Sequence, residues 1–329
     1  MNPNRISNRR CRIPALGVSI AALILVSLIR PAIAFAEEIW FAPTDHLPRN
    51  GVVYVSDFMD LLSEGAPWQH ALARISVWQL SPRFAMAALN VELAKAISFM
   101  NGHHIQLAIG MAMVPVTGCG SSVEGMAVQG HPGEVAWRIK KLGGDLRYVG
   151  MDEPLRFGHQ DKRPVACHLS TVEVAQRVAE SVREVRAVFP EVKFIDEEPV
   201  SDIPGDDWLN ELEQWLDAYQ QSVGEPIGAL QDDIDWSRGP WQERTLAIRD
   251  MLKKREIKYG VMFTAGGPQE SDSAWIEKAK QNIIAYKHVN RTLPDQVYIA
   301  SWNVNPSKVL PETEPTTLTY LVNWYIDNR

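Results

Sequence analysis

Carboxylic acids occur in three groups, and each group follows a short apolar stretch of the chain. The groups are Asp152-Glu153, Asp196-Glu197-Glu198 and Asp232-Asp233. A carboxylate at the end of a buried strand needs water, a cation or a hydrogen-bond donor, although for any single acid a polar loop is explanation enough. Three groups at one end of a sheet would raise each other's pKa, so that one acid stays protonated while its neighbour is ionised.

Two carboxyl groups in different protonation states are what hydrolysis of a glycosidic bond requires. We expect Glu153 to donate the proton, because it ends the most apolar of these stretches and is followed directly by a proline. For the second carboxylate we expect Asp233, with Glu198 as the alternative, and we expect Asp152 and Asp232 to contact the substrate. Retention and inversion of configuration both remain open.

Tryptophans near the ends of the apolar stretches suit a carbohydrate ligand, because a flat indole can cover the C–H face of a sugar ring while its N–H finds a polar partner. Trp236 and Trp302 are expected in the cleft, and Trp78 fits either the cleft or the packing of the core. Asp45 follows the first apolar stretch and is a further candidate for the cleft wall, with a surface loop as the alternative.

Eight apolar stretches can supply the strands that position these residues. Most are continuously apolar, as expected for strands buried on both faces of a parallel sheet. They are residues 38–42, 74–80, 104–111, 146–151, 192–196, 227–231, 258–264 and 296–302. Segments with helical periodicity lie between them, including residues 83–100, 132–142, 171–188, 206–221, 242–255 and 272–289.

Successive strands begin about 30 to 46 residues apart, the length of one βα unit. The prediction is an α/β protein with a single (β/α)8 TIM barrel over residues 37–329. A doubly wound open sheet is the rival architecture, but only a lone Gly-Cys-Gly at 118–120 hints at its phosphate-binding loop.

Residues 1–36 have the features of a cleaved signal peptide. They contain five arginines and no acid, an apolar stretch from Ala15 to Ile29, and the small-residue site Ala34-Phe35-Ala36. The stretch is shorter than the roughly 20 residues that span a bilayer, so cleavage after Ala36, or after Ala34, is favoured over an uncleaved membrane tether. Removal of the segment changes the formal charge from -7 to -12.

Cys119 and Cys167 are the two cysteines that remain after cleavage. In an oxidising compartment such a pair normally forms a disulfide, although two separate buried thiols are an alternative. Their spacing does not favour zinc. The sequence therefore predicts an exported protein, periplasmic or secreted, with one disulfide bond.

The overall composition argues against some classes of binding partner. With 40 acidic against 33 basic residues the chain does not suit nucleic acid, whose affinity comes mainly from Lys and Arg. No GxSxG, HExxH or Walker motif occurs. We expect a carbohydrate substrate, no cofactor, no metal, no association with a membrane after cleavage, and a monomer.

The layout resembles that of the TIM-barrel glycoside hydrolases, through Asp152-Glu153-Pro154 after the fourth strand and Trp302 after the eighth. The resemblance implies that Glu153 is the acid/base and that Trp302 floors a sugar subsite. Asp152 stands where those enzymes usually have Asn, and residues 263–267 (FTAGG) provide no acid where their nucleophilic Glu is expected. The second carboxylate must therefore follow the fifth or sixth strand.

The chain also resembles a group of exported, uncharacterised bacterial barrel proteins. The shared motifs are GGDLRYVGMDEP (residues 143–154), the loop at residues 119–125 and SKVLPETEPTT (residues 307–317). Three functions remain open at this point. They are an exported glycoside hydrolase, a barrel that binds carbohydrate without turnover, and a metal-dependent hydrolase with Asp152, Asp232 and Asp233 as ligands.

Overall fold

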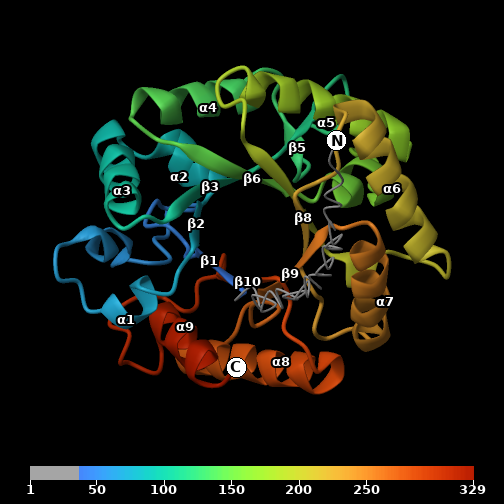
Figure 1. Cartoon of the computed structure of the whole chain (residues 1–329). Helices are drawn as coiled ribbons and strands as arrows, with labels where there is room; N and C mark the ends of the chain where they lie inside the picture. The colour runs from blue at the N-terminus through green and yellow to red at the C-terminus, as the bar shows by residue number, and fades with distance from the viewer. Residues whose placement is uncertain (1–36) are drawn as a thin grey trace, which may run out of the picture. The chain divides into compact units, whose positions relative to one another are not determined.

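A computed structural model describes residues 37–329, which form a closed barrel of eight parallel strands with helices around it (Figure 1). The predicted (β/α)8 barrel is confirmed. The predicted signal peptide, residues 1–36, lies outside the described residues.

The barrel strands agree with the eight predicted stretches to within three residues at either end. In spatial order the barrel runs β1-β10-β9-β8-β7-β6-β3-β2. The strands are β1 (Glu38–Ala42), β2 (Val77–Leu80), β3 (Gln106–Met111), β6 (Leu146–Asp152), β7 (Lys193–Glu198), β8 (Ala229–Asp232), β9 (Lys258–Phe263) and β10 (Gln296–Ala300). A short parallel pair, β4 (Val114–Pro115) with β5 (Met126–Ala127), lies in the connection after β3.

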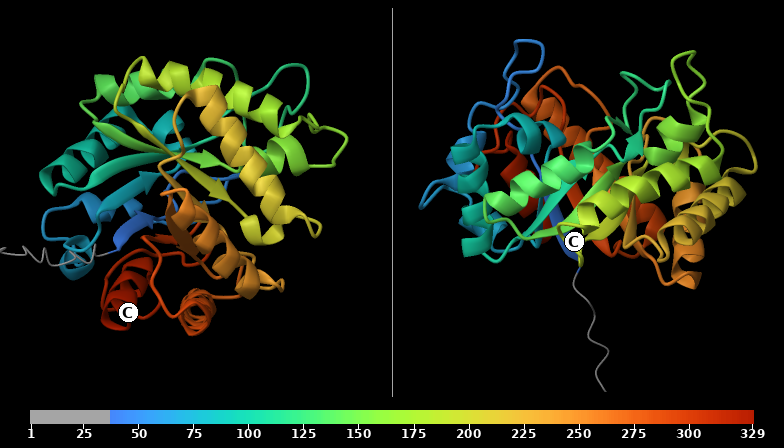
Figure 2. Two further views of the ribbon diagram at one scale, coloured as in Figure 1. Left: turned by 45° about the vertical axis from the view of Figure 1, so that its right-hand side comes forward. Right: turned by 90° about the horizontal axis from the view of Figure 1, so that it is seen from above.

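The helices surround the strands, and Figure 2 shows the connections after β1, β3 and β6 extending from the same side of the barrel. The helices are α1 (Gln69–Leu72), α2 (Pro82–Ala87), α3 (Asn90–Gly102), α4 (His131–Lys141), α5 (Thr171–Arg186), α6 (Trp208–Val223), α7 (Trp241–Lys254), α8 (Asp272–Asn290) and α9 (Leu318–Asp327). Short turns of other helix types occur at Phe58–Leu62, Arg156–Gln160 and Val200–Asp202.

The single helix predicted over residues 83–100 is instead two helices, α2 and α3. Ala88 and Leu89 between them have extended backbone, with ψ of 152° and 146°. Arg138 of α4 donates to the Ala85 carbonyl (2.7 Å) and to the Ala88 carbonyl, and Glu92 accepts from the Leu89 N–H. These side chains satisfy backbone groups that a continuous helix would have paired internally, which local periodicity could not indicate.

Large aromatic side chains fill the part of the barrel interior that lies away from the carboxyl ends of the strands. Trp40 lies 4.9 Å from Tyr148 and 6.0 Å from Tyr298, measured between ring centroids. Near the carboxyl ends of β3 and β6 the inward positions are glycines, Gly110 and Gly150. The interior is therefore filled at its base and open at the end where the strands finish, where barrel enzymes carry their active sites.

Candidate functional site

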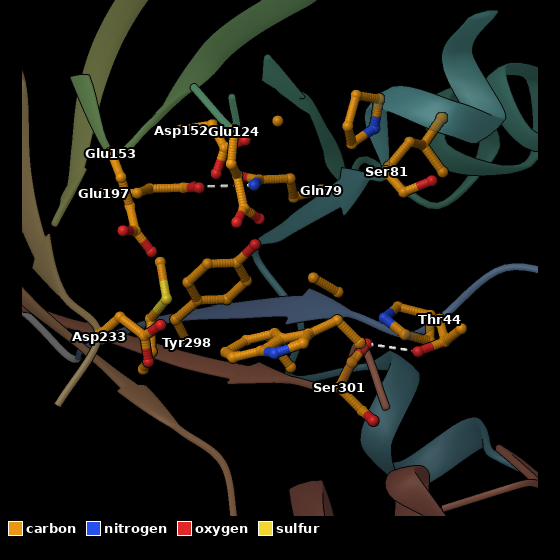
Figure 3. Close-up of a pocket in the computed structure, with 18 of the residues that line it drawn as sticks. Thr44, Gln79, Ser81, Glu124, Asp152, Glu153, Glu197, Asp233, Tyr298 and Ser301 are labelled. Carbon is orange, nitrogen blue, oxygen red and sulfur yellow. Dashed lines mark hydrogen bonds between the residues drawn. The ribbon is translucent and has the colours of Figure 1, made fainter. Parts of the chain in front are cut away.

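A cavity of about 390 Å³ opens at the carboxyl end of the barrel, a size typical of small-molecule sites (Figure 3). Five carboxylic acids line it, and four of them come from β6, β7 or the residues just after β6 and β8. The acids are Glu124, Asp152, Glu153, Glu197 and Asp233. The rest of the wall includes Thr44, Gln79, Ser81, Tyr298, Ser301 and Trp302, with Arg49 as the one cationic residue among the described residues that line it.

Glu153 directly follows β6 and is half-buried in this wall. Its backbone has a φ of 45°, which is rare for a residue other than glycine, and its N–H donates to the Glu197 carbonyl (2.9 Å). Burial raises the pKa of Glu153 to about 9, and the negative charges of Asp233, Asp152 and Glu124 add to the effect. Glu153 therefore carries a proton at neutral pH.

Asp152 is the last residue of β6. Burial and the nearby Glu124 charge raise its pKa to about 6, while the Gly125 N–H works in the opposite direction. Gly125 has a φ of +72°, and a Cβ there would lie 2.6 Å from the Asp152 carbonyl oxygen, so glycine is needed for this approach. The loop carrying Glu124 is thereby held against the end of β6.

Asp233 follows β8, and its N–H donates to the Glu198 carbonyl (3.0 Å). Burial raises the pKa of Asp233 to about 7, with contributions from Asp232, Asp235, Asp152 and Glu124. The structure thus brings Asp152, Glu153 and Asp233 together at one cavity, although they are up to 81 positions apart in the sequence.

Glu197 is a cavity residue that the sequence analysis missed. Its Oε1 accepts a hydrogen bond from Gln79 Nε2 (2.7 Å), drawn in Figure 3. Burial raises the pKa of Glu197 to about 8, while the Gln79 bond lowers it. A Cβ on Gly150 would lie 2.0 Å from that Oε1, so glycine leaves the room this carboxyl group occupies.

Glu198 and Asp232 lie outside the cavity wall, although we predicted both as site residues. Glu198 accepts hydrogen bonds from the backbone N–H groups of Leu155 (2.5 Å) and Arg156 (3.2 Å), and so holds the loop after β6. Asp232 is fully buried and accepts from the Tyr259 hydroxyl (2.9 Å). Alternate residues of a strand face opposite sides, so Glu197 faces into the barrel and its neighbour Glu198 faces the surrounding helices.

Of the three predicted tryptophans, Trp302 lines the cavity with 40% of its surface exposed. Trp78 is fully buried between barrel and helices, packed on Phe41 and Trp68. Trp236 is 8% exposed and stacks on Phe263 with 6.0 Å between centroids. Trp78 and Trp236 therefore serve as packing residues in this fold.

Asp45 is 1% exposed and does not line the cavity. Its two carboxylate oxygens accept from the Leu47 N–H (2.8 Å) and the Ser81 hydroxyl (2.5 Å). The neighbours Thr44 and Ser81 do line the cavity, so Asp45 fixes the shape of its wall from behind.

The predicted disulfide between Cys119 and Cys167 is confirmed. It joins the loop after β3, which carries Glu124, to the loop after β6, which follows Glu153. No helix within residues 37–329 is both long and apolar enough to cross a membrane. The same residues contain no group of three His, Cys, Asp or Glu side chains placed to share a metal ion, so the ligand set Asp152, Asp232 and Asp233 does not converge.

Comparisons with known proteins find similar structures but no similar sequence. No family model matches it, and no curated protein matches its sequence. Among solved structures, fungal β-1,4-galactanases are similar at 7% identity with a TM-score of 0.53, over 88% of this chain and 100% of theirs. A glucosidase from Croceicoccus marinus has 12% identity and a TM-score of 0.51, over 87% of this chain and 67% of its own.

At these identities the likeness shows the TIM-barrel fold alone. Matches with TM-scores below 0.5 include a GH10 endoxylanase from a sugarcane soil metagenome (12% identity, 0.48, over 88% of this chain and 97% of its own) and a D-psicose 3-epimerase (14% identity, 0.39, over 76% and 98%). The barrel therefore has glycoside hydrolases among its structural neighbours, and the argument for a reaction must come from the cavity itself.

Proposed function

We propose that this protein is a glycoside hydrolase in which Glu153 is the proton donor and Asp233 is the second carboxylate. The observation that carries the proposal is that these two acids come from different strands, line one cavity and have separated pKa values, about 9 and about 7. Such a separation is how a pair of carboxyl groups divides into an acid and a base.

The roles follow from the electrostatics of the pair. Burial raises the pKa of Glu153 most, and the charge of Asp233 is the next largest cause. The Glu153 proton is therefore held while Asp233 ionises, and it can pass to the departing glycosidic oxygen. Asp233 then either attacks the anomeric carbon or activates water, the two options open to the second carboxylate.

A carbohydrate substrate is supported by the exposed indole of Trp302 beside these acids. An aromatic face next to polar groups suits a sugar, which has an apolar face and a polar rim. Asp152 and Glu197 lie in the same wall and would contact the bound ring. The fold is one that glycoside hydrolases use, which is consistent with the proposal.

Export belongs to the proposal as well. The sequence of residues 1–36 has the pattern of a signal peptide, and a disulfide suits an oxidising compartment. We propose that cleavage after Ala36 releases the barrel as a monomer into the periplasm or the medium. The mass of the exported protein and its elution volume test both statements.

The test of the activity is a glycan panel with detection of new reducing ends. For a substrate found in this way, Glu153→Gln and Asp233→Asn should each lower kcat about 10²-fold or more, because each removes a group that moves a proton or electrons in the transition state. Asp250→Asn, an exposed acid on α7, is the matched control and should retain full activity. Activity that survives in Glu153→Gln refutes the assignment.

A barrel that binds carbohydrate without turnover is the second candidate. Its support is the end of β9, where Phe263 is followed by Thr264 and Ala265 and which contributes Met262 but no acid to the cavity. Binding of glycans by the folded protein, with no products from any of them, would favour this reading.

A further inference from the structure

The cavity contains more carboxylic acids than hydrolysis uses. If Glu153 and Asp233 perform the reaction, then Glu124, Asp152 and Glu197 remain in the same wall. Arg49, the one lining cation among the described residues, donates to the Trp302 carbonyl (3.2 Å) and lies 5.5 Å from the centre of the Tyr54 ring. The guanidinium of Arg49 is thus engaged at the rim, and none of the five acids forms an ion pair with another residue in 37–329. The nearby Arg156 and Arg163 are paired with Asp202 and Asp161 instead.

A second feature of the cavity is an acceptor without a donor. The Oε1 atom of Gln79 is buried and accepts no hydrogen bond from any described residue, and the residue is 5% exposed. Its Nε2 is committed to Glu197, which fixes the amide in the orientation drawn in Figure 3. A buried acceptor left in this way costs free energy, so the wall is suited to a ligand that brings hydrogen-bond donors.

We propose that the sugar bound here carries a free amino group, as glucosamine and galactosamine units do, and that its ammonium is held by Asp152 and Glu124. This inference rests on the proposed function and narrows its substrate class. An ammonium brings three donors and a positive charge to a wall that has acceptors and negative charge in excess. An N-acetylated sugar lacks that charge, and a uronic acid would be repelled.

The electrostatics of Asp152 support the same ligand. Burial and the charge of Glu124 raise the pKa of Asp152, so Asp152 holds its proton more tightly than an exposed aspartic acid does. A bound ammonium favours the ionised form of Asp152, so the complex should release protons to the buffer. A neutral sugar has no such effect, so proton release separates the two kinds of ligand.

The experiment is titration calorimetry with glucosamine oligomers and N-acetylglucosamine oligomers of equal length and linkage, at pH 6.5. It uses Glu153→Gln protein, so that no hydrolysis interferes. We expect the amine form to bind at least tenfold more tightly and to release protons, as shown by heats that change with the ionisation enthalpy of the buffer. Glu124 is exposed at the rim, so Glu124→Gln should fold normally. Glu124→Gln and Asp152→Asn, each combined with Glu153→Gln, should reduce the preference for the amine form about tenfold.

Asp250→Asn, combined with Glu153→Gln, is the matched control. It removes one negative charge from an exposed position on α7 and should leave the preference for the amine form unchanged. Equal affinity for the two oligomers overturns the inference, as does a preference that the two cavity variants leave intact or that Asp250→Asn lowers equally. If wild type hydrolyses only neutral or acetylated glycans through Glu153, the hydrolase stands and the amine inference fails. If amine oligomers bind through Asp152 and no glycan is cleaved, the amine site stands and the hydrolase fails.

Discussion

Asp232 offers a test of how burial controls ionisation in this barrel. The side chain is fully buried between the barrel and the surrounding helices, and burial raises its pKa from an ordinary value near 3.8 to about 7. The Tyr259 hydroxyl is its hydrogen-bond donor. Asp232→Asn keeps the shape of the side chain and removes its charge at every pH, so the variant isolates the cost of ionising this one acid.

The sign of the effect follows from proton binding. Between pH 4 and pH 7 the folded protein keeps the Asp232 proton while the unfolded chain has lost it, so the free energy of unfolding falls as the pH rises. The slope is about 1.4 kcal/mol per pH unit for one proton, and it disappears above the folded-state pKa. From pH 5 to pH 8 the wild type should therefore lose about 3 kcal/mol relative to Asp232→Asn.

Urea denaturation of both proteins from pH 5 to pH 8 measures this difference directly. In thermal unfolding it should appear as a relative gain of roughly 5 °C for the variant at pH 8. Asp250→Asn removes the same formal charge from an exposed position and should keep a constant difference from wild type across the range. A constant difference for Asp232→Asn would show that the group is ionised in the folded protein at pH 5, and the burial argument would be wrong.

Three further perturbations follow from the structure. Gly150→Ala places a methyl group 2.0 Å from the Glu197 carboxyl oxygen, so it should destabilise the fold by about 1–3 kcal/mol in urea melts and weaken glycan binding; an unchanged variant would contradict the close approach. Trp302→Ala should lower saccharide affinity about tenfold in calorimetry without changing the melting temperature, because the indole is 40% exposed, and unchanged affinity would remove it from the site. Cys119→Ser breaks the bond to Cys167 and should cost about 2–4 kcal/mol of stability, and a melting curve identical to that of oxidised wild type would count against the bond.

The sequence did not indicate which of Glu197 and Glu198 faces the cavity. All five residues Phe194 to Glu198 are buried, so no alternation of polar and apolar residues marks which of them face into the barrel. Ile195 belongs to the interior cluster, and the residue two positions later must face the same way. With one inward residue known, Glu197 would have been chosen over Glu198, and the same alternation assigns Gln79 to the cavity and Trp78 to the packing.

The sequence by itself determined the eight strands, their alternation with helices, and three of the acids that meet at one end, Asp152, Glu153 and Asp233. It could do so because burial on both faces demands continuous apolar stretches, and because parallel strands all finish at the same edge. Tertiary structure alone decided which face each side chain took, that Trp236 packs in the core, and that Glu124 approaches Asp152 from a distant loop. Those outcomes depend on how the barrel closes and on contacts between residues far apart in the chain, and such contacts leave no local pattern in the sequence.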